Sequence, residues 1–303
     1  MRARLIAAFV AVYVIWGSTY LAIRFAVQTL PPLLMASARF VIAGLIVLVW
    51  ARFRDGEAWP SRGEWKVGWI SGALLLLGGN GGVSWAEQRV PSGIAALLVA
   101  VVPVFMVLLE WLRPGGKRPS AAVFAGVGLG LVGLTLLVGP GALRGGERAD
   151  GVGALVLVLA SLSWAAGSLY TKFAPKTASG TKSTGTQMLA GGLALLLAAI
   201  VAGEPAQLDL AHASTSSLVA FLYLLTFGSL IGFTAYVYLL AHTSAAKAAT
   251  YAYVNPVVAV FLGWAIGHEA VTSRTMVAAA VILAGVAIIT VTRDAEPVTR
   301  TGR

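Results

Sequence analysis

Residues 96–104 read Ala-Leu-Leu-Val-Ala-Val-Val-Pro-Val, and residues 249–257, 153 positions later, read Ala-Thr-Tyr-Ala-Tyr-Val-Asn-Pro-Val. The same shift superimposes Met35 on Met188. A single match between two apolar sequences arises easily by chance, but several matches at one shift do not. The sequence therefore predicts an internal repeat, and this repeat decides the fold.

The repeat divides the chain into residues 1–141 and 151–293, with residues 294–303 as a cytoplasmic tail. Hydrophobic residues make up 58% of the chain and charged residues only 11%. A helix needs about 20 apolar residues to cross the roughly 30 Å core of a bilayer. Runs of this kind predict membrane-spanning helices at residues 5–27, 33–51, 67–86, 91–112, 120–139, 152–171, 183–202, 217–240, 246–267 and 275–292.

Each half contains five of these predicted helices. Because five is an odd number, the second half enters the membrane from the opposite side to the first. We therefore expect an all-α membrane protein with ten transmembrane helices, arranged as two inverted five-helix repeats. Inverted repeats are typical of secondary transporters, in which a site near the midplane opens alternately to each side.

The basic residues predict the orientation of these helices. Of the 22 Lys and Arg residues, all except Arg39 flank a predicted span. Those on one side are Arg24, Arg89, Arg144, Arg148 and Arg274, and the larger remainder lies on the other side. The positive-inside rule places that second side, with both termini, in the cytoplasm. The net charge of +10 is thereby explained, and no nucleic-acid partner is expected.

Several classes of chemistry are not expected from this composition. The chain contains no cysteine, so it has no disulfide framework and no thiolate metal site. It has no His-Glu-x-x-His pattern, no Asp within a predicted span and no Gly-x-Ser-x-Gly motif. We therefore expect neither an enzyme nor a cofactor. The expected partners are a small-molecule substrate and the lipid bilayer, and a monomer is compatible with the sequence.

The opening of the chain resembles a known family. Residues 16–20 (Trp-Gly-Ser-Thr-Tyr), Arg24, Pro31-Pro32 and Arg39-Phe40 are similar to the start of an EamA-type member of the drug/metabolite transporter superfamily. The predicted helices around Pro103 and Pro256, with Glu269 beyond the second, resemble its fourth and ninth helices. Residues 109–117 look closest to YddG/YedA-type bacterial exporters. The resemblance implies ten helices in the bacterial inner membrane and export of amino acids or related metabolites.

One departure from the family pattern concerns acidic residues. The repeat partner of Glu269 is Gly116, and the nearest acid in the first half is Glu110. A symmetric pair of acidic residues that couples transport to an ion is therefore not expected.

Small residues and prolines mark where the helices depart from ideal geometry. Residues 78–82 (Gly-Gly-Asn-Gly-Gly) interrupt the third predicted helix, and Gly228, Ser229 and Gly232 lie at matching depth in the eighth. Two interpretations stay open, namely a bend that exposes carbonyls and Asn80, or close helix packing through small residues.

The two repeated prolines are expected to kink their helices and to free carbonyls near Val99 and Ala252.

Polar and aromatic side chains inside the spans are candidates for the transport path, whereas those near the interfaces are expected to be anchors. Trp16 and Tyr20 share one helix face, as do Trp164 and Ser168. The predicted substrate-binding residues are Trp16, Thr19, Tyr20, Asn80, Ser84, Pro103, Trp164, Ser168, Tyr251, Tyr253, Asn255 and Pro256.

The charge of the predicted cavity indicates its cargo. A buried Arg costs about 2.5–3.5 kcal/mol on insertion scales, so Arg39 is expected either to reach outward or to pair with Glu87 at the external mouth. With Arg39 and Lys247 near opposite ends, an acidic side chain would meet no cation at the midplane. The cargo expected is a neutral, above all aromatic, amino acid. The alternative is export of drugs or cationic compounds.

Overall fold

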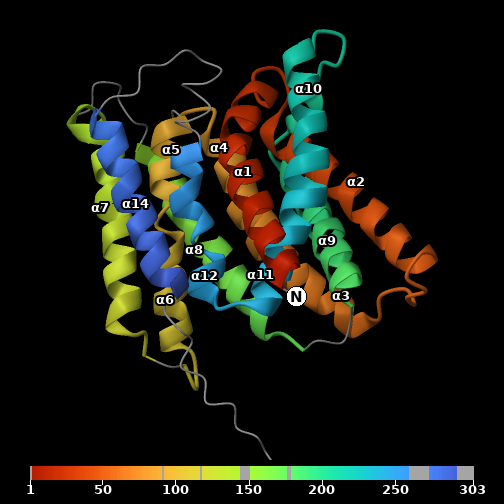
Figure 1. The fold of residues 1–303 in the computed structure, drawn as a ribbon. Coiled ribbons are helices and arrows are strands. Elements are labelled where there is room, and N and C mark those ends of the chain that lie inside the picture. Colours follow the sequence, from red (N-terminus) through yellow and green to blue (C-terminus); the bar gives the residue numbers. More distant parts are fainter. Residues whose placement is uncertain are drawn as a thin grey trace, which may run out of the picture.

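The computed structural model describes residues 2–90, 92–116, 118–143, 151–175, 179–258 and 273–291 (Figure 1). The helices of the first half are α1 (Arg2–Ala26), α2 (Pro32–Phe53), α3 (Arg62–Gly72), η1 (Ala73–Gly81), α4 (Gly82–Ala86), α5 (Ser92–Val99), α6 (Val102–Leu112) and α7 (Ala121–Leu143). Those of the second half are α8 (Gly151–Phe173), α9 (Gly180–Val201), η2 (Glu204–Gln207), α10 (Thr215–Tyr223), η3 (Leu224–Phe233), α11 (Thr234–His242), α12 (Ala245–Ala248) and α14 (Ser273–Val291). Residues 251–258 are also helical. The prediction of an all-α protein is confirmed over these ranges.

Five helical stretches within the described ranges are long and apolar enough to cross a membrane. They are α1, α2, α8, α9 and the continuous stretch Thr215–His242, which comprises α10, η3 and α11. The third expected span is a succession of α3, η1 and α4, and the fourth is divided between α5 and α6. The ninth includes residues 259–267, which lie outside the described ranges, so the number of ten crossings stays a prediction.

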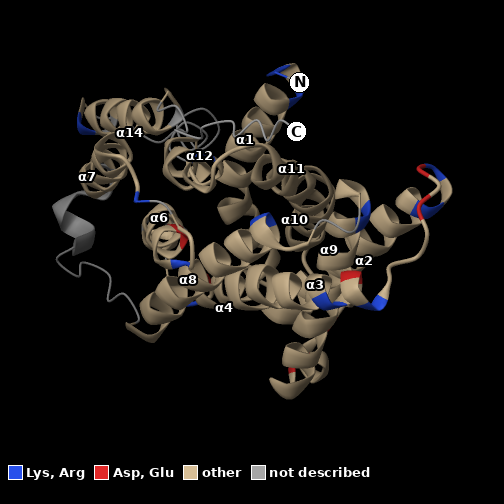
Figure 2. Cartoon of the chain, turned by 90° about the horizontal axis from the view of Figure 1, so that it is seen from below, with Lys and Arg blue, Asp and Glu red and all other residues tan. Residues whose placement is uncertain are grey.

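The outer surface has the character of a lipid-facing one. Large apolar side chains are exposed on the outside of the bundle, including Ile6 at 63% and Leu197 at 61%. Figure 2 shows the Lys, Arg, Asp and Glu residues gathered mostly at helix ends and in loops, while the helices between them are otherwise uncharged. A soluble protein rarely exposes apolar surface so extensively, so the chain is a multi-pass membrane protein. Its orientation in the membrane stays a prediction.

Glycines bring helices of the two halves into backbone contact. A Cβ atom on Gly44 of α2 would lie 2.5 Å from the Leu189 nitrogen of α9. At the other side of the bundle, a Cβ atom on Gly126 of α7 would lie 2.9 Å from the Gly285 oxygen of α14. Such distances leave no room for a side chain, so small residues permit the close approach. The two halves therefore interlock through α2 with α9 and through α7 with α14.

An ion-pair cluster joins α3 to α9 at the end of the bundle where α1 begins. Lys182 Nζ lies 3.0 Å from Glu64 Oε1 and 3.3 Å from Glu57 Oε2. Burial raises the pKa of the Glu64 carboxyl, but hydrogen bonds from Ser61 and Lys182 outweigh it and leave that pKa below its usual range. The hydrogen bond to Glu64 raises the pKa of Lys182.

Candidate functional site

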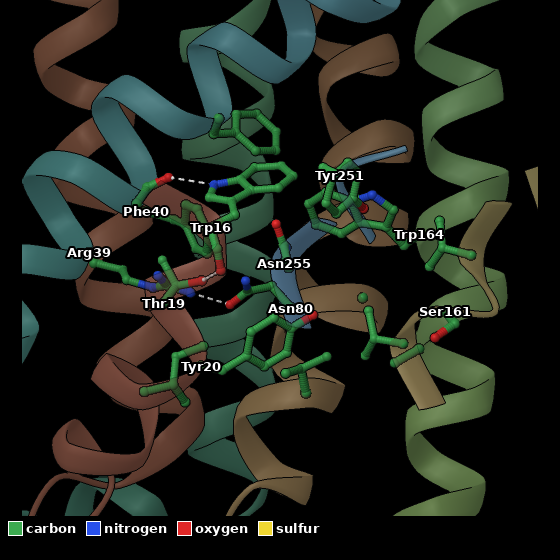
Figure 3. A pocket seen from close by; sticks show the side chains of 18 residues that line it. Trp16, Thr19, Tyr20, Arg39, Phe40, Asn80, Ser161, Trp164, Tyr251 and Asn255 are labelled. Atoms are coloured by element: carbon green, nitrogen blue, oxygen red, sulfur yellow. Dashed lines mark hydrogen bonds between the residues drawn. The ribbon is translucent and has the colours of Figure 1, made fainter. Parts of the chain in front are cut away.

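A cavity lies at the centre of the bundle, between helices of both halves (Figure 3). Its walls come from α1, α2, η1, α4, α8, η3 and helical residues 251–258, with Val99 and Val102 at the junction of α5 and α6. Its empty space, counted out to the open mouth, is about 670 Å³. Because that figure includes open solvent at the mouth, it is an upper bound on the room for a ligand.

The cavity brings together seven of the residues that the sequence predicted for substrate binding. They are Trp16, Thr19, Tyr20, Asn80, Trp164, Tyr251 and Asn255. Five others do not line it, namely Ser84, Pro103, Ser168, Tyr253 and Pro256. A role of any of these residues in binding stays a prediction. The five lie outside the wall of the cavity, where the sequence reasoning expected them.

Tyr253 was expected to present its ring to the cavity, and this placement is wrong. Its ring packs against Gly130 of α7, and its hydroxyl donates to the Val127 oxygen at 3.4 Å. Tyr251 and Asn255 occupy the cavity side instead because residues 251–258 are helical and positions four apart share one face.

The expectation of a kink at Pro103 is replaced by a break. Helix α5 ends at Val99, and α6 starts at Val102 with Pro103 in its first turn. A proline is well tolerated there because the first amides of a helix have no partner within the helix. Val99 lines the cavity, and Pro103 is buried beside the break. Pro256 lies within helical residues 251–258.

Both glycine-rich segments are π-helical, in η1 and in η3. Each wide turn offers a backbone carbonyl to a side chain of another helix. Trp16 Nε1 donates to the Gly228 oxygen at 3.2 Å, and Ser163 Oγ donates to the Leu74 oxygen at 2.8 Å. The same segments pack closely, since a Cβ atom on Gly79 would lie 2.7 Å from the Trp164 ring. Close packing through small residues is therefore observed, and Asn80 lines the cavity, while a bend of these helices stays a prediction.

Aromatic rings cluster at one end of the cavity. The Trp16 ring centroid lies 5.4 Å from that of Trp164, 5.0 Å from Tyr236 and 4.9 Å from Tyr251. The Tyr236 hydroxyl accepts a hydrogen bond from Trp164 Nε1 at 3.2 Å and lies 2.6 Å from Ser168 Oγ. Ser168, which does not line the cavity, thus contacts the aromatic cluster through the Tyr236 hydroxyl. Sequence reasoning missed Tyr236, a buried residue that does not line the cavity but whose ring contacts those of Trp16, Trp164 and Tyr251.

Arg39 departs from the first of the two sequence interpretations, and it meets the second only as an electrostatic interaction with Glu87. It does not reach outward, because it is only 2% exposed and lines the cavity. It does not form a hydrogen bond with Glu87 either, since both carboxylate oxygens of Glu87 are buried without a hydrogen-bond partner. Instead, Arg39 Nη2 donates to Asn80 Oδ1 (Figure 3). The expectation that cargo meets no cation in the cavity is therefore wrong.

A second cavity opens nearer the end of the bundle at which α1 begins. It holds about 1,430 Å³ of empty space, counted out to its mouth, and α3, α8, α9 and α11 line it. Helix α8 contributes Ser161 and Trp164 to the central cavity and Thr171 to the second one. Between these levels on α8 lies Ser168, whose Oγ is 2.6 Å from the Tyr236 hydroxyl that accepts from Trp164 Nε1. The two cavities are thus successive chambers along the same helices.

Comparison with known proteins agrees with this architecture. The chain is 40% identical over 287 residues to YedA, named as an uncharacterized inner membrane transporter of Escherichia coli K12, covering 94% of this chain and 90% of YedA. It is 27% identical to the uncharacterized transporter YoaV of Bacillus subtilis, covering 93% and 95% of the two chains. A solved crystal structure matches with a TM-score of 0.75 at 21% identity, covering 95% of this chain and 97% of that one, which supports the fold alone.

The EamA-like transporter family matches residues 3–139 and 151–291, so one copy of the family domain covers each half. These two copies agree with the internal repeat, and the match to YedA agrees with the resemblance to YddG/YedA-type proteins. The relatives and the apolar helices together support a multi-pass inner membrane protein. The chain therefore belongs to the EamA-like transporter family.

Proposed function

We propose that this protein exports neutral amino acids, aromatic ones above all, across the inner membrane. The observation that carries the proposal is the pair of cavities along α8, with the hydrogen-bonded group of Trp164, Tyr236 and Ser168 at the part of α8 between Trp164 and Thr171, which line one cavity each. Alternating access requires one central site that is closed toward one side at a time. Movement of these rings would join the central chamber to the second one while other contacts close its opposite mouth.

The aromatic wall supports the choice of cargo. Ring–ring contacts contribute about 0.5–1.5 kcal/mol beyond the burial of surface. Trp16, Trp164 and Tyr251 all line the central cavity and already contact other rings. An aromatic side chain of the cargo would extend this cluster.

Export of drugs or cationic compounds is the second candidate. A cation-selective cavity would favour acidic side chains in its wall, because a desolvated cation needs a negative partner. The described lining of the central cavity contains Arg39 and no Asp or Glu. This composition disfavours cations and supports the amino-acid proposal.

Counterflow into liposomes that contain the purified protein tests the proposal. We expect labelled Phe to accumulate in liposomes that are loaded with unlabelled neutral amino acids, with and without a pH gradient. Asp should compete poorly with Phe for this uptake. Trp164→Ala should reduce this uptake, whereas Trp69→Ala should not, since Trp69 is 39% exposed on α3. Equal movement of Phe and Asp, or movement of a cationic dye and no amino acid, would reject the proposal.

A further inference from the structure

Two polar atoms in the wall of the central cavity have no hydrogen-bond partner. They are Arg39 Nε, which is a donor, and Asn255 Oδ1, which is an acceptor. Both residues are 2% exposed, and both line the cavity. Buried polar atoms in native proteins are almost always paired with protein, water or ligand. An unpaired donor and an unpaired acceptor in one cavity therefore indicate a ligand that carries both complementary groups.

The guanidinium of Arg39 is held in position with its Nε group unpaired. Its Nη2 donates to Asn80 Oδ1, and its Cζ lies 4.4 Å from the centroid of the Phe40 ring. These two contacts restrict rotation of the side chain and leave Nε without a partner. A guanidinium edge matches a carboxylate in geometry and charge, because two parallel N–H groups can donate to the two oxygens.

Glu87 does not occupy the donor groups of Arg39. It interacts electrostatically with Arg39, yet neither of its oxygens accepts a hydrogen bond. The Nε donor of the guanidinium therefore stays available to a ligand.

Asn255 places an acceptor in the same cavity wall. Tyr20 lines the cavity together with Asn255, and the Asn255 Oδ1 is left unpaired. An amide oxygen accepts hydrogen bonds and cannot donate them, so its natural partner is a cationic or neutral N–H group. Figure 3 shows Asn255 and Asn80 in the middle of the ring of labelled residues, with Trp16 and Trp164 close by.

We infer that the cavity binds the backbone of an α-amino acid as a zwitterion, with its carboxylate on Arg39 and its ammonium on Asn255 Oδ1. The side chain of the amino acid then lies among Trp16, Trp164 and Tyr251. This inference rests on the proposed function, and it adds which atoms recognise the cargo. It also explains why Asp and Glu are poor cargo, since Arg39 is the only cation in the described lining and the backbone carboxylate occupies it.

Three probes separate the two contacts: Phe, phenylalaninamide, which lacks the carboxylate, and 3-phenylpropionate, which lacks the ammonium. Calorimetry with the purified full-length protein should give the tightest binding for Phe. In Arg39→Gln, binding of Phe and of 3-phenylpropionate should weaken by roughly tenfold or more, because a charge-assisted hydrogen bond is lost. Binding of phenylalaninamide should not change.

The converse pattern is expected for Asn255→Ala. Binding of Phe and of phenylalaninamide should weaken, and binding of 3-phenylpropionate should stay the same. Arg24→Gln is the matched control, because Arg24 also interacts electrostatically with Glu87 but does not line the cavity. It should leave the binding of all three probes unchanged. If Arg39→Gln does not fold, Arg39→Lys and the Asn255 arm decide the question.

Equal weakening of all three probes by either variant would overturn the inference, because a general structural effect would then explain the loss. Equal binding of Phe and phenylalaninamide to the wild type would overturn it as well. Transport of Phe by the wild type in either case would leave the proposed function intact. Arg39-dependent binding of 3-phenylpropionate together with no transport of any amino acid would reject the proposed function and retain the carboxylate site.

Discussion

Replacing Trp164 should change the cargo preference in a way that the geometry predicts. Its ring contacts Trp16 at 5.4 Å, Tyr236 at 5.4 Å and Phe233 at 6.4 Å between centroids, and it lines the central cavity. A ring contact with the cargo contributes about 0.5–1.5 kcal/mol, which corresponds to roughly 2- to 13-fold in affinity. Trp164→Ala should therefore lower the preference for Phe over Val by about this factor.

The conservative variant Trp164→Phe separates this effect from a loss of folding. Truncating a buried Trp to Ala costs about 3–5 kcal/mol, a large part of the usual 5–15 kcal/mol of stability. Trp164→Phe keeps a ring and loses the hydrogen bond from Nε1 to the Tyr236 hydroxyl. Half-saturation constants for Phe and Val in counterflow are the measurement. An unchanged ratio in a folded Trp164→Ala protein would refute the reasoning.

Three further predictions follow from features outside the aromatic cluster. A reporter fused after Arg293 should lie in the cytoplasm and one inserted at residues 144–148 in the periplasm, and finding both on one side would exclude the ten-span inverted repeat. Pro103→Ala and Pro256→Ala should each lower transport while expression and melting temperature change little, and normal transport by both would reduce these prolines to packing residues. Glu64→Gln should lower the melting temperature at pH 7. Because the pKa of Glu64 is lowered in the folded state, its stabilisation is full above its ordinary value of 4.5 and is lost as the pH falls through the lowered pKa. As the pH falls below 5, the variant should therefore lose less stability than the wild type. Parallel curves of melting temperature against pH for the two proteins would contradict the role of this carboxyl.

Long-range apolar patterning was sufficient to predict an all-α membrane protein, and the resemblance of motifs such as residues 16–20 was sufficient to identify the family. This patterning could not predict which face of residues 251–258 lines the cavity. Tyr251 and Tyr253 are equally aromatic, and a helix turns them to different sides. The choice depends on Gly130, which leaves space for the Tyr253 ring in a helix more than a hundred residues earlier. Sequence alone gives no information about such a space.

The placement of Arg39 was unpredictable for a related reason. Its partner Asn80 lies on another helix, and the depth of a charge in a span does not show which way its side chain points. The glycines of η1 and η3 indicated a departure from regular helix in both halves, and that expectation was useful. The sequence could not distinguish a bend from a π-helix, because the hydrogen-bond register depends on the neighbours that pack against it.

The contact of α2 with α9 restricts which parts of the bundle can move relative to one another. Transport cycles of this architecture are often described as one repeat rocking against the other. Here a helix of each repeat is seated on the other at backbone distance, and sliding would drive Leu189 into the Gly44 backbone. We therefore expect the mechanical units to be mixed pairs, each with one helix from each repeat. A disulfide engineered between α2 and α9 should consequently be compatible with transport, because it would join two helices that move together.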